Sequence, residues 1–148
     1  MKLTFDDIVD KHKGQSCVIA LHGPSLAPYI EKIQELQKSK KITRFSVNEW
    51  FDYFSTKPDY WVVSNTEFNI RDSILNENVW KIRDYPIDVF NTYKVPLIYN
   101  RAADLTDPAF VEDNLDFEYL PYDNKHFKGH SCIEVLKNFK KYYEENKN

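Results

Sequence analysis

Glycine is scarce in this chain of 148 residues, which contains only three. Each of them is therefore expected where the backbone requires a residue without a side chain. Cysteine is scarcer still, and Cys17 and Cys132 are too far apart in the sequence for a C-x-x-C zinc or redox motif. We expect two free and buried thiols in a reducing compartment.

Long apolar runs and an excess of positive charge are also missing. No segment approaches the roughly 20 apolar residues of a membrane helix, and the first ten residues hold three aspartates instead of an apolar signal-peptide core. The net charge of −3 offers no basic surface for a nucleic-acid backbone. The basic stretch at 137–141 is expected to be a solvated helix face. The sequence thus predicts a cytoplasmic protein without a membrane segment or a nucleic-acid partner.

What is present is the composition of a folded domain, with 42% hydrophobic and 16% aromatic residues. This apolar content excludes a disordered chain. A chain of this length also buries enough surface to fold without a disulfide or a structural metal. We expect a single domain over residues 1–148.

Short apolar runs alternate with amphipathic segments along the chain. The runs predict strands at 17–21, 42–47, 60–63, 95–99 and 117–120. Helices are predicted at 4–14, from about Pro28 to Lys38, at 50–54, 69–75, 106–114 and 131–143, and the rest of 67–94 is predicted to be irregular. Because parallel strands need crossover connections, this alternation predicts an α/β domain with a mostly parallel sheet flanked by helices. The aromatic residues between 50 and 61 are expected to pack in its core rather than to form a base-stacking wall.

Polar residues follow three of the first four predicted strands. They occupy positions 22–25, 48–49 and 64–66. The carboxyl ends of parallel strands share one edge of the sheet, where ligands bind in open α/β folds. The sequence therefore predicts a ligand site at this edge, with no metal and no identifiable catalytic residue.

The turn after the first strand has the strongest signal. Gly23 and Pro24 begin it, Gly23 lets a ligand approach the backbone closely, Ser25 adds a hydroxyl, and the helix start behind them suits a phosphate. The turn is neither a Walker loop nor the three-glycine dinucleotide fingerprint. The alternative is an ordinary strand-to-helix turn in which Ser25 caps the helix.

The remaining candidates each have a structural alternative. The amide of Asn48 suits a base or a sugar, but the residue is equally suited to cap a helix. Asn65 has the same two interpretations, with capping favoured. His22 is suited to a phosphate contact or to acid–base chemistry, although a lone histidine more often only packs. His126 and His130 give a metal site only weak support.

The first half of the chain resembles a known family. Residues 17–26 are similar to the strand, Gly-Asn-Gly-Pro-Ser-Leu turn and helix that open certain bacterial sialyltransferases, and equally to the related domain of archaeal 6-hydroxymethylpterin diphosphokinases. Residues 45–51 and 58–64 resemble their second and third strands. The resemblance covers residues 14–66 well and 95–101 loosely, and it implies a three-layer Rossmann-like domain that binds a nucleotide.

The resemblance also implies a function. In the sialyltransferases the Gly-Pro-Ser turn and the asparagine after the second strand hold the CMP of the donor, so Gly23, Pro24, Ser25 and Asn48 would contact a nucleotide or nucleotide sugar here. A glycosyltransferase-like domain is the first expectation. A non-catalytic binding or assembly module of the same fold is an alternative. A diphosphokinase of the pterin type is another, and it would need Mg²⁺ held by acids near the site, namely Glu49, Asp52 and Glu67.

The chain departs from this family at two points. Leu21 and His22 stand where the family has glycine and asparagine. The family also continues with a further strand, a helix and a catalytic histidine that have no counterpart in these residues. We therefore expect a domain that is truncated relative to the family.

Overall fold

The computed structural model describes residues 1–21, 23–63, 85–101 and 112–148. Five strands form one sheet in which every neighbouring pair is parallel. The strands are β1 (Ser16–Ala20), β2 (Ile42–Val47), β3 (Tyr60–Val63), β4 (Leu97–Asn100) and β5 (Tyr119–Tyr122). The predicted Rossmann-like α/β fold is confirmed.

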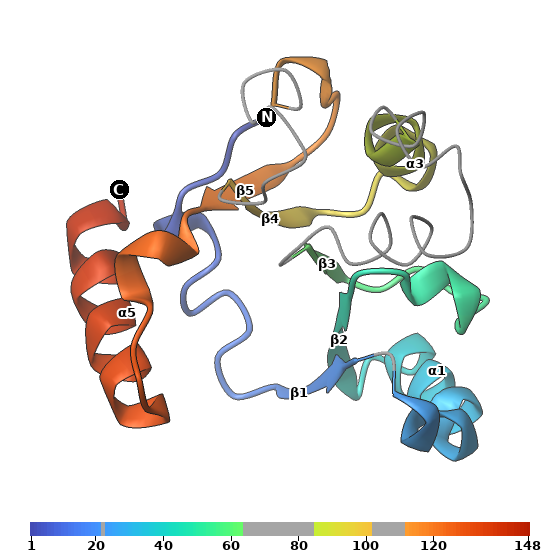
Figure 1. Ribbon diagram of the computed structural model, residues 1–148. Coiled ribbons are helices and arrows are strands. Elements are labelled where there is room, and N and C mark those ends of the chain that lie inside the picture. The colour runs from blue at the N-terminus through green and yellow to red at the C-terminus, as the bar shows by residue number, and fades with distance from the viewer. Residues whose placement is uncertain (22, 64–84, 102–111) are drawn as a thin grey trace, which may run out of the picture.

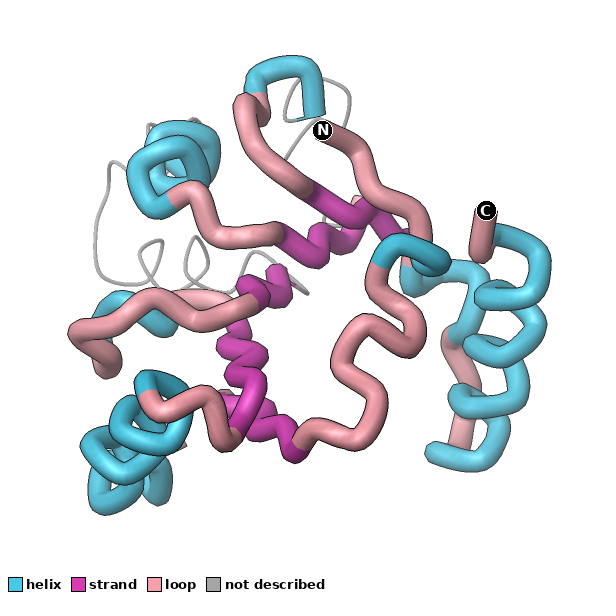
Figure 2. The backbone as a smooth tube through the Cα atoms, turned by 180° about the vertical axis from the view of Figure 1, so that it is seen from behind, coloured by secondary structure: helices cyan, strands magenta, loops and turns pink. Residues whose placement is uncertain are grey.

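Helical segments lie on both sides of the sheet. They are η1 (Phe5–Asp7), η2 (Pro24–Tyr29), α1 (Ile30–Lys38), η3 (Trp50–Asp52), α3 (Tyr85–Tyr93), η5 (Asn124–Phe127) and α5 (Cys132–Asn146). Figure 1 shows α1 and α3 on one side of the sheet, and α5 with the N-terminal segment on the other. The view from behind in Figure 2 shows the same separation into three layers.

The strands follow one another across the sheet in the order β1-β2-β3-β4-β5. Rossmann folds that bind dinucleotides place the ligand where the strand order reverses. No such reversal occurs among the described strands, so their carboxyl ends form one continuous row. Any ligand site on this row must be made by the loops that follow individual strands.

The core lies between the sheet and the layer that contains α1 and α3. The register pairs Ser46 with Trp61, and Trp61 with Leu97, which places all three on the same face. Trp61 is 2% exposed, and its ring makes edge contacts with the rings of Trp50, Phe51, Phe90 and Tyr93. The predicted core role of the aromatic residues between 50 and 61 is confirmed.

The N-terminal helix predicted at 4–14 is wrong except for its first turn. Thr4 and Asp7 form a capping box at the start of this segment, in which the Thr4 N–H donates to Asp7 Oδ2 at 2.7 Å. Helical structure ends at Asp7, and Asp10 adopts a positive φ of 63°. Long-range contacts determine the conformation of this segment. The ring of Phe5 packs against three rings of α5, those of Phe139, Tyr142 and Tyr143.

Two further expectations are wrong, and two predicted helices lie wholly or mostly outside the described residues. The helix α3 falls where irregular chain was predicted, although Pro86 next to its start is a helix-start signal. Both cysteines are exposed instead of buried, Cys17 on β1 and Cys132 at the start of α5. The helix predicted at 69–75 and most of that at 106–114 lie outside the described residues.

The helix predicted at 131–143 is present as α5, and Ser131 caps it by accepting a hydrogen bond from the Glu134 N–H. Its lysines at 137, 140 and 141 are exposed, as predicted.

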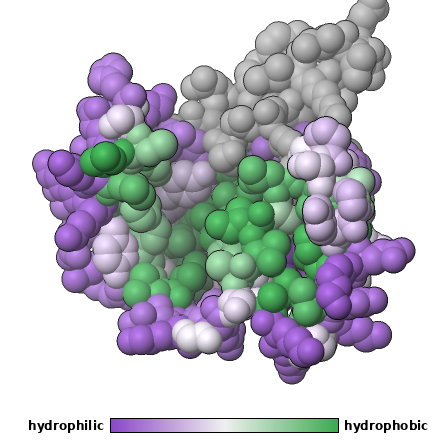
Figure 3. Space-filling model, turned by 90° about the horizontal axis from the view of Figure 1, so that it is seen from below, coloured by the Kyte–Doolittle hydropathy of each residue, from purple (hydrophilic) through white to green (hydrophobic). Residues whose placement is uncertain are grey.

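Exposed apolar side chains also occur on α5 and on β1, for example Ile133 and Ile19. Seen from below, apolar residues gather at the centre of the molecule between hydrophilic flanks (Figure 3). Among the described helices, none has the length and apolar character needed to cross a membrane.

Candidate functional site

The predicted site residues meet at the carboxyl ends of two adjacent strands. The register pairs Ala20 of β1 with Ser46 of β2, so the turn that begins at Gly23 and the residue Asn48 both lie just beyond the same edge. Of the predicted site residues, Gly23, Pro24, Ser25 and Asn48 are described here. His22 and Asn65 lie outside the described residues.

Gly23 has a backbone that any residue can adopt, with φ −77° and ψ 156°. Among the described residues, an added Cβ would meet only Ser25 Oγ, at 3.8 Å. The expectation that every glycine is required by the fold is therefore wrong at this position. It holds at Gly14, where φ is +81°, and at Gly129, where a Cβ would come within 2.9 Å of Glu134 Cγ. Within the described part of the chain, the missing side chain at Gly23 leaves open space beside the turn.

The turn presents few backbone donors. Pro24 is the first residue of η2 and has no N–H, and the Leu26 N–H donates to the Gly23 carbonyl at 3.1 Å. Ser25 is exposed. It does not cap the helix, because Gly23 is the capping residue and no side chain bonds there. The turn thus offers the hydroxyl and the N–H of Ser25 to a ligand, which is less than a full helix start provides.

Asn48 occupies a left-handed position directly after β2. Its φ is 54°, and its side chain is buried at 6% exposure. Its N–H donates to the Val62 carbonyl and its own carbonyl accepts from the Trp50 N–H, both at 2.9 Å. The predicted helix cap is wrong, because Glu49 is the residue that precedes η3. Asparagine suits this position because it tolerates the left-handed conformation.

This conformation makes a stability prediction. Asn48→Ala and Asn48→Gly both remove the buried amide, but only alanine keeps a Cβ at positive φ. We expect the alanine variant to be less stable than the glycine variant by about 1 kcal/mol, measured by urea unfolding monitored by tryptophan fluorescence. Equal stabilities would mean that the backbone conformation is not what selects asparagine here.

Other polar residues are buried along the same edge. Ser46 is 0%, Glu49 5% and Asn100 2% exposed, and Asn100 Oδ1 accepts from the Asn124 N–H at 3.4 Å. The sequence predicted Glu49 only as a possible Mg²⁺ ligand. Its side chain is buried and therefore does not face solvent. Asp52 is exposed, and Glu67 lies outside the described residues. Within those residues, no three His, Cys, Asp or Glu side chains group as metal ligands do.

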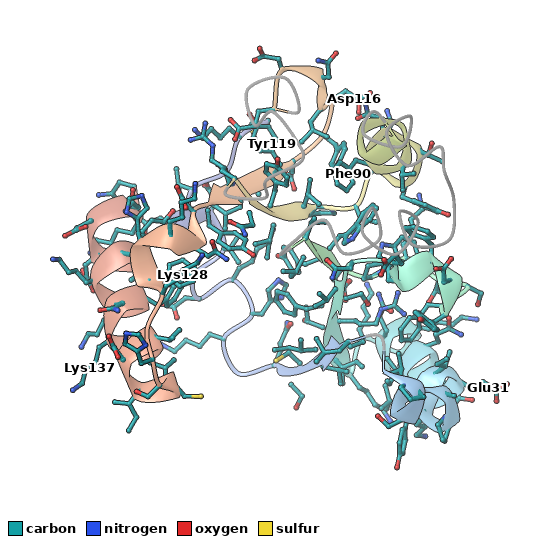
Figure 4. The ribbon with its side chains drawn as sticks, viewed as in Figure 1. Glu31, Phe90, Asp116, Tyr119, Lys128 and Lys137 are labelled. Carbon is teal, nitrogen blue, oxygen red and sulfur yellow. The ribbon has the colours of Figure 1, made fainter. Side chains whose placement is uncertain are left out.

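A second feature lies at the opposite, amino end of the sheet. A depression of about 600 Å³ runs between α1 and the chain that leads into β3, lined by Gln34, Gln37, Thr56 and Asp59 among others. Gln34 Oε1 accepts from the Thr56 N–H at 3.2 Å, and Gln37 Nε2 donates to the Lys57 carbonyl at 2.8 Å. Glu31 also lines it, on α1 (Figure 4). These hydrogen bonds hold α1 against the loop before β3. Among the described residues, none lines both this depression and the predicted site.

Comparison with protein-family models, with curated proteins and with solved structures finds no match to this chain. The fold is thus identified by its parallel sheet and interleaved helices.

Proposed function

We propose that the chain binds a nucleotide or nucleotide sugar at the carboxyl ends of β1 and β2, as a glycosyltransferase-like domain. The observation that carries this proposal is the open space at Gly23, where the fold itself does not need a glycine. A ligand that approaches the backbone supplies a reason for the missing side chain.

The residues around this space have matching chemistry. The exposed hydroxyl of Ser25 and its N–H suit phosphate oxygens. Asn48 follows the adjacent strand and carries both a donor and an acceptor, which suits a base or a sugar. This arrangement agrees with the assignment implied by the sialyltransferase resemblance. The resemblance favours a CMP-linked donor.

The test is a graded series at Gly23, with calorimetric titration of CMP and UMP. The Cβ of Gly23→Ala meets nothing closer than 3.8 Å among the described residues, and Gly23→Val extends from the same position. We expect each variant to change the free energy of unfolding by no more than about 0.5 kcal/mol. Nucleotide affinity should fall by about tenfold or more, and further for valine than for alanine, because the added methyl groups occupy the ligand's space. Ala27→Val, on the exposed side of the same segment, is the matched control. Unchanged affinity in Gly23→Val, or no binding by the folded protein at millimolar nucleotide, contradicts the proposal.

A non-catalytic module of the same fold is the second candidate. It is favoured by the strand order, which has no reversal among the described strands and thus none of the crevice that such folds use. Incubation with CMP-linked and UDP-linked sugars separates the two candidates. Release of CMP or UDP indicates transfer or hydrolysis, whereas binding without release indicates a module. If Mg²⁺ strengthens nucleotide binding, the diphosphokinase alternative gains support.

A further inference from the structure

A second cavity lies at the far end of the same sheet edge. Its volume is about 300 Å³, and it opens where β4 and β5 end, against residues 2–5 and α5. The strand order puts β3 between these strands and the β1–β2 site. The cavity is therefore separate from the proposed nucleotide site.

Main-chain hydrogen bonds fix the walls of this cavity. The Leu3 N–H donates to the Tyr119 carbonyl at 2.7 Å, which holds Lys2 along the outer edge of β5. The Arg101 N–H, just after β4, donates to the Tyr122 carbonyl at 2.7 Å. The ring of Phe5 packs edge-on against Tyr142 of α5, 6.0 Å between centroids. Residues from four separate parts of the chain thus line one preformed hollow.

The buried tyrosine of this cavity has a hydrogen to donate. Tyr142 is 8% exposed, and its hydroxyl oxygen accepts from the Asp123 N–H at 3.0 Å. A hydroxyl that accepts from an amide keeps its own O–H for another acceptor. Among the described residues, no acceptor for this O–H is found.

The carboxylate that lines the cavity is already engaged. Asp123 Oδ1 accepts from the Lys125 N–H at 2.9 Å, and Oδ2 lies 3.6 Å from Nε2 of His126. The His126 ring stacks on that of Tyr142. The Tyr142 hydroxyl lines the cavity beside this carboxylate and offers its O–H to a ligand.

Two permanent cations add to these donors. Lys2 and Arg101 both line the cavity. Nε of Arg101 pairs with Glu112 Oε1 at 2.8 Å, which orients the guanidinium and uses one of its five N–H groups. Leu120 and Pro121 supply an apolar surface beside them.

We propose that this cavity binds a small organic anion. Its carboxylate or phosphate group meets Lys2, Arg101 and the Tyr142 hydroxyl, and its apolar body contacts Leu120 and Pro121. The volume is at the lower end of the range for small-molecule sites, so it suits a ligand of one ring and one anionic group.

The test titrates the full chain with phenyl phosphate, benzoate and the neutral benzyl alcohol, followed by calorimetry and by amide chemical shifts. Saturable binding of one or both anions, at least about tenfold tighter than the alcohol, supports the proposal. The stronger of the two anions identifies the headgroup. If benzyl alcohol binds as tightly as both anions, or if the shifts lie outside residues 2–5, residue 101, residues 120–126 and residues 142–148, the proposal fails.

Two variants test the assigned groups. Tyr142→Phe keeps the ring and removes the O–H, and Lys2→Gln removes a charge from an exposed residue. Each should weaken binding of the preferred anion by about tenfold. Tyr143→Phe, next along α5, is the matched control and should bind normally. Gly23→Val should also bind normally, so that failure here and failure of the nucleotide proposal are distinguishable. Unchanged affinity in both Tyr142→Phe and Lys2→Gln overturns the assignment.

Discussion

Replacement of Trp61 by alanine is expected to lower the free energy of unfolding by about 4 kcal/mol. Trp61 is among the largest fully buried side chains, at 2% exposure, and it lies in the middle strand of the sheet between β2 and β4. Its ring connects Trp50 of η3 with Phe90 of α3. Alanine would leave a cavity where the helical layer meets the sheet. Urea unfolding followed by circular dichroism measures the change.

Two controls sharpen this result. The indole Nε1 of Trp61 is buried without a hydrogen-bond partner in the described part of the chain, so Trp61→Phe loses volume but no hydrogen bond. We expect it to destabilise the fold by about half as much as alanine does. Tyr29→Ala, at a side chain that is 61% exposed, should change stability by less than about 0.5 kcal/mol. If Trp61→Ala behaves like Tyr29→Ala, the packing described for the core is wrong.

Arg44→Ala is expected to cause the next largest loss, about 3 kcal/mol. Arg44 lies in β2 and is 0% exposed. Its guanidinium donates to the carbonyl and hydroxyl oxygens of Thr56 and lies 4.0 Å above the ring of Phe54. Its backbone N–H donates to Asp59 Oδ2 at 2.8 Å. Alanine removes the stacking and leaves the Thr56 carbonyl without this donor.

The variant Arg44→Met separates the effect of side-chain volume from the effect of charge. Its loss of stability relative to wild type is expected to depend on pH. Burial lowers the pKa of Arg44 to about 10, against the opposing effect of the nearby Asp59 carboxylate. Above pH 10 the folded chain releases this proton while the unfolded chain keeps it, so this group adds stability as pH rises. Met keeps the volume and avoids a buried charge, so near pH 7 its loss should be smaller, about 1 kcal/mol. That loss, relative to wild type, should grow by about 1 kcal/mol between pH 9 and pH 11. A constant difference across this range contradicts the buried-charge interpretation.

The strands and the fold class could be predicted from the sequence because their signals are local. The strands are short runs rich in apolar residues, and polar residues follow three of the first four predicted ones. The structure places all five strands within about two residues of the expected positions. The start of α5 was equally clear, since Ser131 and Glu134 have the spacing of a capping box. Alternation of such runs with amphipathic segments leaves few folds other than a parallel α/β sheet.

The features that were missed depend on contacts between distant segments or on backbone angles. The capping signal at Thr4 favours a helix, but pairing with β5 and packing against α5 hold this segment in another form. The thiol of Cys17 is exposed because it lies with the exposed Ile19 on the face of β1 opposite the core residues Val18 and Ala20, and a continuous apolar run does not reveal which face is covered. At the candidate site, the left-handed backbone conformation that glycine usually adopts is found at Asn48, whereas Gly23 has an ordinary φ. The residue types alone suggest the opposite.

The sequential strand order also has a consequence for how the sheet assembles during synthesis. Each of β2, β3, β4 and β5 pairs with the strand made just before it, so the sheet can grow at one edge as the chain emerges from the ribosome. Residues 1–3 are the exception, because they pair with Tyr119 and the Met1 amino group donates to the Phe117 carbonyl. Residues 1–3 can pair only after β5 (Tyr119–Tyr122) has been made. We therefore expect their pairing with β5 to be among the last contacts to form.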